Sequence, residues 1–185
     1  MSGSREVPRR SGRLAGVRES LRSALRVQRR LVYGFDLSAD PPPAAPGAPV
    51  SFSWEPPGAD GDEWFHGERE GRRVYSMRVS TDQASIRRLV ACATVEAPAA
   101  FLYDCATTPD SRGMGIYPAA LAAALRDLKA RGARAAYIRV HRANAASIRG
   151  IEKAGFRLLG EVAHVTVLGR SLRPFAWRRA PGEGR

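Results

Sequence analysis

The alternation of apolar and polar positions along the chain predicts a strand-rich domain with a few helices. Short runs of β-branched and aromatic residues, separated by turns containing Gly, Pro and Asp, are typical of strands. We therefore expect strands at residues 30–37, 50–55, 63–69, 72–80, 99–107, 134–140, 156–169 and 173–179. The segments 63–69 and 72–80 are joined by a Glu-Gly turn and should form a β-hairpin. Segment 99–107 is apolar almost throughout, which indicates a strand buried on both faces.

Other segments show the spacing of amphipathic helices. Residues 118–131 carry leucines on one face, with Pro118 at the first helical position and a glycine just past the end. Residues 145–154 follow Asn144, whose side chain is suited to cap a helix, and a short helix is expected over 82–91. Because 118–131 connects two predicted strands, we expect a right-handed crossover and a parallel strand pair.

The N-terminal part of the chain differs from the rest in composition. Residues 1–12 are small, polar and arginine-rich, which predicts a disordered basic tail. Residues 13–32 place leucines and valines at nearly helical spacing opposite arginines, and we interpret them as a basic amphipathic helix. The proline-rich stretch 40–49 predicts a stiff linker. Region 13–49 thus combines a helix, an early strand and a linker, and we place the main domain at 50–180.

The charge of the chain is concentrated in the same N-terminal part. The 185 residues carry a net charge of +12, and residues 1–30 hold nine of the arginines. Three explanations stay open for this segment: docking on its own domain, contact with nucleic acid or a membrane surface, and disorder. The remaining chain is only modestly basic, as expected of a domain that binds an anionic ligand.

The cysteines and the absence of long apolar runs indicate the compartment. Cys92 and Cys105 lie in apolar runs, and neither belongs to a pair with metal-ligand spacing. We interpret both as reduced core thiols and predict no metal site. No apolar run reaches the roughly 20 residues that span a bilayer. The N-terminus lacks the apolar region of a secretory signal and only weakly resembles a transit peptide, so a cytoplasmic protein is expected.

The segment TTPDSRGMGIYPAAL, residues 107–121, joins the buried strand to the following helix. Gly113 and Gly115 let the chain turn sharply and let a ligand approach the backbone closely. The first N–H groups of a helix lack partners and lie at the positive end of its dipole, so this loop is suited to a diphosphate. The loop matches neither the dinucleotide fingerprint nor a P-loop, because no third glycine and no Gly-Lys-Ser/Thr follow. A simple connecting turn is the alternative.

Two motifs, about 30 residues apart, resemble those of the GNAT superfamily of N-acetyltransferases. The first is an Arg-x-x-Gly-x-Gly/Ala loop after the central strand, and the second combines Asn-x-x-Ser with Glu-Lys-x-Gly-Phe. The matching residues are Arg112, Gly115, Tyr117, Asn144, Ser147, Glu152, Lys153, Gly155 and Phe156. The resemblance covers residues 99–162 well and the hairpin region 62–80 in outline.

The resemblance implies a fold, a co-substrate and a reaction. The fold class would be a GNAT-like α/β (α+β) fold: a mixed, mostly antiparallel sheet with a splayed central parallel strand pair, flanked by helices. Acetyl-CoA, or another acyl-CoA, would lie in the splay, and an amine would attack its acyl group directly. The residues implied in its binding are Cys105, Ala106, Thr107, Arg112, Gly113, Met114, Gly115, Ile116, Tyr117, Asn144 and Ser147.

The catalytic residues are less clearly marked. Ile151 stands where many members of the family carry the tyrosine that protonates the leaving thiolate, which leaves Ser147, water or another residue as the donor. Asp104 is the acid within the apolar strand, where burial would favour its neutral form and suit it to accept a proton. Glu161, His141 and water are alternatives for the base, and Asp104 could instead bond to a neighbouring backbone group.

The sequence also departs from the family in its acceptor side. Residues 55–62 are too short for the two helices that usually form much of the acceptor pocket, so the pocket is open, completed by the 13–32 helix, or built by a second subunit in a homodimer. Tyr117 replaces a usual Gly or Ala, and its phenol should point out of the diphosphate turn. The acceptor would be an amine on a sugar, small metabolite or peptide. The alternatives are a capping role for Asn144 and Ser147, and a catalytically inactive CoA-binding regulatory or interaction module.

Overall fold

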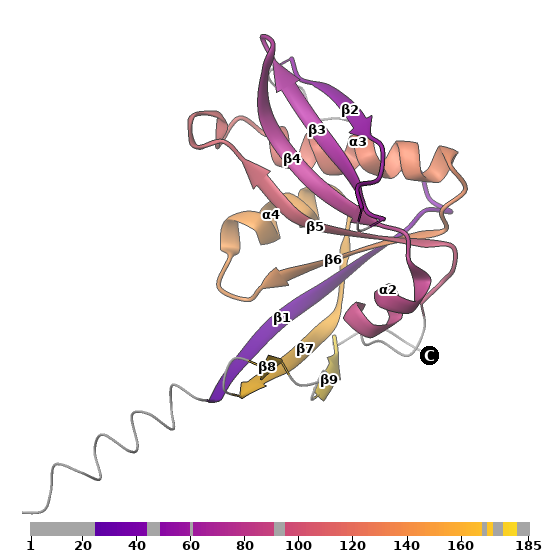
Figure 1. Ribbon diagram of the computed structural model, residues 1–185, viewed down its shortest axis with the longest axis vertical. Helices are drawn as coiled ribbons and strands as arrows, with labels where there is room; N and C mark the ends of the chain where they lie inside the picture. Colours follow the sequence, from indigo (N-terminus) through magenta and orange to yellow (C-terminus); the bar gives the residue numbers. More distant parts are fainter. Residues whose placement is uncertain are drawn as a thin grey trace, which may run out of the picture.

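The computed structural model describes residues 25–43, 49–59, 61–90, 95–167, 170–171 and 176–180. Figure 1 shows one twisted sheet with helices packed against it. The predicted basic tail 1–12, the first part of the predicted helix, and Cys92 lie outside the described residues. Within the described part of the chain, no helix is both long enough and apolar enough to cross a membrane.

Nine strands form the sheet, and β5 and β6 are its parallel neighbours among the described strands. The strands are β1 (Leu25–Asp36), β2 (Ser51–Glu55), β3 (Glu63–Arg69), β4 (Arg72–Ser80), β5 (Ala99–Thr107), β6 (Ala135–His141), β7 (Arg157–Val167), β8 (Arg170–Ser171) and β9 (Ala176–Arg179). Their order is β2-β3-β4-β5-β6-β1-β7-β8, with β9 also paired to β7. This confirms the predicted mixed, mostly antiparallel sheet with a central parallel pair.

Helices cover both faces of the sheet. They are α2 (Gln83–Val90), the short 3₁₀ helix η1 (Pro109–Ser111), α3 (Ile116–Ala130) and α4 (Ala145–Lys153). Leu102 and Ile138, on β5 and β6, are buried on the face covered by α3 and α4. Their neighbours Phe101 and Tyr137 are buried on the face covered by α2, as the pleat of a strand requires. Full burial of such a side chain stabilises the fold by roughly 1.5–3 kcal/mol.

Strand β1 corrects the prediction for the N-terminal region. The predicted helix 13–32 is wrong from Leu25 onward, because β1 pairs with β6 on one edge and with β7 on the other. Val32 and Tyr33 are both buried, on opposite faces. A run that is apolar at successive positions fits helical and strand spacing alike, and hydrogen bonding along both edges favours the strand. The sheet therefore begins before residue 50, where the predicted domain started.

Most other predicted bounds are confirmed. Strands β3, β4 and β5 have the predicted ends. Strand β2 differs by one residue at one end, and β6 and α2 differ by one residue at each end. Asn144 caps α4, because its Oδ1 accepts a hydrogen bond from the Ser147 N–H at 3.1 Å. Helix α3 begins at Ile116, so Pro118 is its third residue rather than its first. None of the first four N–H groups of a helix has an intrahelical partner, so proline is tolerated there too.

Candidate active site

The parallel strands β5 and β6 separate in the middle of the sheet. Their pairing joins residues 99–102 to residues 135–138, and beyond Leu102 the two strands are no longer paired with each other. The pairing of β5 with β4 shifts register next to Asp104, which has a φ of +50°. Such a bulge bends a strand. The edge of β5 that faces β6 is therefore open from Tyr103 to the end of the strand.

A cavity of about 750 Å³ occupies this gap. On the α2 face its lining includes Ser85, Leu89, Phe101 and Arg139. On the α3 and α4 face its lining includes Cys105, Tyr117, Asn144 and Ser147. Side chains of both faces thus meet in one space within the sheet.

The glycine loop lies between the end of β5 and the start of α3. Gly113 and Gly115 have φ values of +80° and +74°, in the left-handed region that favours glycine, and Gly115 is the N-cap of α3. Among the described residues, the N–H groups of residues 113–117 donate to no backbone carbonyl. A Cβ placed on either glycine would meet nothing within 4 Å. The loop therefore presents unused N–H donors to open space at the positive end of a helix dipole.

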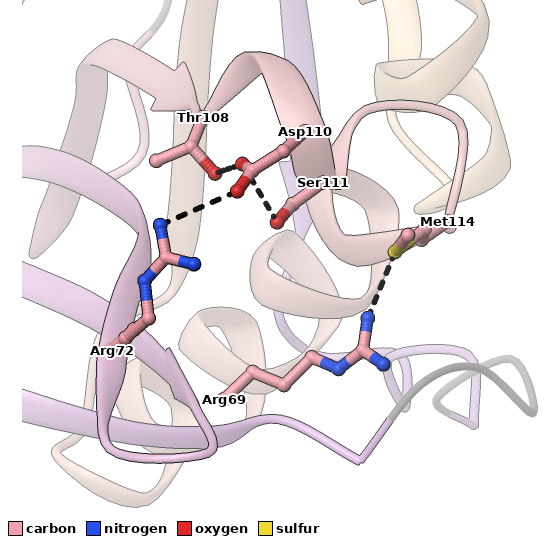
Figure 2. A network of polar contacts seen from close by, with 6 residues as sticks. All are labelled: Arg69, Arg72, Thr108, Asp110, Ser111 and Met114. Atoms are coloured by element: carbon pink, nitrogen blue, oxygen red, sulfur yellow. Dashed lines mark hydrogen bonds and ion pairs between the residues drawn. The ribbon is translucent and has the colours of Figure 1, made fainter.

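Two arginines of the β3–β4 hairpin reach this loop (Figure 2). Arg69 Nη1 lies 3.1 Å from the Met114 sulfur, and Arg72 Nη2 lies 3.4 Å from Asp110 Oδ2. The hydroxyl of Thr108, followed by smaller contributions that include Arg72, lowers the pKa of Asp110. These contacts bring two guanidinium groups beside the unused N–H groups, each with a carboxylate nearby, Glu70 for Arg69 and Asp110 for Arg72. The sequence alone did not predict either arginine as a neighbour of the loop, although the two stand on either side of the predicted Glu-Gly hairpin turn.

The predicted CoA-binding residues on β5 and in the loop are brought together. Ala106 and Thr107 pair with β4 on one edge of β5, and their other edge faces the open gap. Arg112 is exposed, and its Nε donates to the Thr107 carbonyl oxygen at 3.3 Å. This contact holds the arginine side chain against the end of β5, next to the glycine loop.

Tyr117 fills the space between α3 and α4 and points away from the loop into the cavity lining. Its ring centroid lies 6.2 Å from that of Tyr75, and a Cβ on Gly150 would overlap its ring. Burial, and then the neighbouring Cys105 thiol, raises the pKa of Tyr117 above its usual range. Ile151 is fully buried in the core instead. Tyr117 thus brings a hydroxyl to this part of the cavity.

The three acid–base candidates differ in their surroundings. Asp104 is exposed, so the expectation that it is buried is wrong; the bulge turns its side chain out of the apolar strand. His141 is exposed at the end of β6 and lines the cavity. Glu161 is not among the cavity residues, and its carboxylate lies 3.6 Å from Arg29 and 3.9 Å from Arg142. The geometry favours Asp104 and His141 over Glu161.

Comparison with known proteins adds a family to this geometry. The profile of the acetyltransferase (GNAT) family matches residues 38–156. Among curated proteins, none matches the chain significantly. No group of three or more His, Cys, Asp or Glu side chains with metal-binding geometry occurs within the described residues.

Solved structures with a similar fold include several acetyltransferases. A GNAT-family protein from Novosphingobium aromaticivorans DSM 12444 aligns with a TM-score of 0.55 at 20% identity, over 80% of this chain and 69% of that one. A GCN5-related N-acetyltransferase from Sphaerobacter thermophilus aligns with a TM-score of 0.54 at 16% identity, over 89% of this chain and 58% of that one. At such identities the likeness shows a similar fold and carries nothing further. The chain spans little more than half of the second structure.

Proposed function

Because the chain belongs to the GNAT family of acetyltransferases, we propose that it transfers an acyl group, in the simplest case acetyl, from acyl-CoA to a primary amine. The observation that carries this proposal is the gap between β5 and β6, which opens beside the glycine loop at the start of α3. A thioester arm in the gap and a diphosphate on the loop would lie on one continuous surface.

The proposed binding mode uses backbone groups for most of its contacts. The N–H groups of residues 113–117 would hold the diphosphate, and Arg112 and the hairpin arginines Arg69 and Arg72 would add charge. The pantetheine amides would pair with the open edge of β5 over residues 103–107. Asn144, the cap of α4, and Ser147 would lie beside the sulfur end of the arm.

Acyl-CoA supplies the acyl group as a thioester, so the protein has to position it and move protons. Asp104 stands at the gap and would accept the proton that the attacking amine loses, with His141 as the second candidate. A backbone N–H on the open edge of β5 would polarise the acyl carbonyl. The Ser147 hydroxyl would give a proton to sulfur, and the proton taken up by Asp104 would restore that hydroxyl through solvent. The nitrogen–carbon bond forms, the carbon–sulfur bond breaks, and one proton passes from nitrogen to sulfur.

The state of Cys105 supports direct attack rather than a covalent acyl-enzyme. Burial raises the pKa of its thiol from 9.0 to about 11, so at pH 8 only about one molecule in a thousand carries the thiolate, the nucleophilic form.

We expect Cys105 to resist iodoacetamide at pH 8 and to react as the pH approaches 11. Because the pKa is higher in the folded chain, the thiol favours folding below about pH 9, and this contribution is lost toward pH 11. Acylation of Cys105 after incubation with acetyl-CoA, seen by mass spectrometry, would contradict direct attack.

The proposed function can be tested in two steps. Acetyl-CoA at about 100 times its Kd should raise the free energy of unfolding by about 2.7 kcal/mol, measured as a higher Tm. Free CoA thiol should then appear only when an amine acceptor is added. No stabilisation by any acyl-CoA would contradict both binding and transfer.

A second candidate function is a catalytically inactive CoA-binding regulatory or interaction module. It is favoured by Ile151, because an apolar, buried side chain stands at the position where many members of the family carry the tyrosine that protonates the leaving thiolate. This candidate predicts stabilisation by acyl-CoA without thiol release for any amine. Thiol release with even one amine class would exclude it.

The acceptor side would be built mainly by α2 and by the ends of β1 and β6. Among the described residues between β2 and β3 none is helical, so this connection adds no cover to the cavity. We propose a cytoplasmic enzyme that acts on an amine of a sugar, small metabolite or peptide, with a second copy of the chain adding cover to the acceptor side.

A further inference from the structure

Strand β1 brings basic side chains into the acceptor half of the cavity. In its antiparallel pairing with β6, Arg30 lies opposite His141 and Val32 opposite Arg139. Residues two apart on a strand share a face, so Arg30 and Arg139 are diagonal neighbours, and both line the cavity. Val32 is buried on the α2 face, which places the two arginines on that face as well.

Arg139 is held in a defined position. Its Nη1 donates to the Leu89 carbonyl oxygen in the last turn of α2 at 3.1 Å, and its guanidinium lies 5.5 Å from the centre of the Phe101 ring. Burial, and then the nearby Arg30 guanidinium, lowers the pKa of Arg139 to about 10. Two like charges beside one cavity repel each other. An anion between them would turn this repulsion into attraction.

The acidic side chains that line the cavity have partners of their own or lie at the strand gap. Asp62 accepts a hydrogen bond from the Tyr103 hydroxyl and lies 3.6 Å from Arg78. Asp82 caps α2 by accepting from the Ala84 and Ser85 N–H groups. Asp104 lies at the strand gap. Among the cavity carboxylates, Asp62 and Asp82 are thus engaged by these partners and Asp104 stands at the gap, where the amine would react. The two guanidinium groups lie on the α2 face.

We propose that Arg30 and Arg139 form a subsite for an anionic group of the acceptor, so that the acceptor is a small amine that also carries a carboxylate or phosphate. This inference rests on the proposed acyl transfer. Diagonal side chains of this length can converge on one oxyanion, and a guanidinium binds carboxylate and phosphate with paired hydrogen bonds. Gln28, whose Oε1 lies 3.4 Å from Arg30 Nη2, helps to hold Arg30 at the cavity.

Matched amine pairs test the proposal by kinetics. Each pair differs only in the anionic group: an α-amino acid and its carboxamide, or an aminoalkyl phosphate and its alcohol. For the wild type we expect kcat/KM to be about 10- to 100-fold higher for the anionic member of at least one pair, the scale of hydrogen bonds to charged groups. Whichever pair responds identifies the anion as carboxylate or phosphate. Equal use of both members in every pair would overturn the proposal.

Charge-neutral variants locate the effect. Arg30→Gln and Arg139→Gln should each lower the preference for the anionic member by about 10-fold and leave the stabilisation by acetyl-CoA unchanged. Arg149→Gln, an exposed position on α4 outside the cavity, is the matched control and should keep the preference. If Arg139 only fastens α2, Arg139→Gln will lower the Tm while Arg30→Gln changes nothing, and that outcome contradicts the subsite.

A binding measurement separates this proposal from the proposed function. Inorganic phosphate should raise the Tm of the wild type more than that of Arg30→Gln. The glycine loop is the same in both proteins, so its phosphate binding cancels in the difference. An equal rise in both would overturn the subsite even if acyl transfer is active. A larger rise in the wild type would support the subsite even if no acyl-CoA binds.

Discussion

Replacing Gly115 by glutamate is expected to lower the affinity for acyl-CoA by at least about 100-fold while the chain stays folded. Gly115 is the N-cap of α3, and a side chain there would extend into open space. A carboxylate at this point faces the N–H groups proposed to hold the diphosphate, so it competes with the ligand for the donors and repels its charge. Calorimetric titration with acetyl-CoA measures the affinity, and circular dichroism reports the fold.

Two further variants separate charge from backbone strain. A non-glycine residue in the left-handed region costs about 1–2 kcal/mol wherever it stands. Gly132→Glu carries the same charge and strain at the other end of α3, where φ is +87° and a Cβ also meets nothing within 4 Å. It should lose somewhat more stability, because a carboxylate is unfavourable at the C-terminal end of the helix dipole, and keep its affinity. Gly115→Ala should bind more tightly than Gly115→Glu. Equal affinity of Gly115→Glu and Gly132→Glu would remove the loop from the site.

Replacing Gly150 by alanine is expected to lower the free energy of unfolding by about 1–3 kcal/mol, the usual cost of an added group in a packed core. The new Cβ would lie 2.9 Å from Tyr117 Cε1 and closer still to Cδ1. Helix propensity alone gives the opposite sign, because alanine in a helix interior is about 0.5–1 kcal/mol better than glycine. Urea unfolding, followed by circular dichroism, measures the change.

A double-mutant cycle assigns this cost to Tyr117. Tyr117→Ala removes the ring that the new Cβ would overlap, so Gly150→Ala should be neutral or stabilising in that background. The coupling between the two sites should then be at least about 1 kcal/mol, within the range of contacting residues. An equal effect of Gly150→Ala in both backgrounds would show that the two residues do not share this space.

Local chemistry explains why much of the fold could be predicted from the sequence. The β3–β4 hairpin is marked by its turn and by flanking apolar residues, and the α4 cap is marked by Asn144. Strand β1 depends instead on partners that lie 99 or more residues away in the sequence. The local sequence pattern therefore predicted a helix for this apolar run, whereas its pairing with β6 and β7 makes it a strand.

The residues of the candidate site likewise differ in how far local sequence predicts them. Sequence motifs singled out Tyr117, Asn144 and Ser147, and all three line the cavity, whereas residues 112–116 of the glycine loop are not among its lining residues. The exposure of Asp104 depends on a bulge that is set by the pairing of β5 with β4, and no local pattern announces it. Arg30 enters the cavity because β1 pairs with β6. Whether these residues bind acyl-CoA or its acceptor stays a prediction.

The position of β1 also has a consequence for how the chain folds. The first described strand lies between β6 and β7, so β7 and β9 join the rest of the sheet through it. Val32 pairs with Arg139 on one side and with Gly160 on the other. During synthesis β1 thus has to wait for partners that lie roughly 100 or more residues later in the chain. Contacts of such long sequence separation slow folding, and until they form, both edges of β1 stay available to strands of other chains.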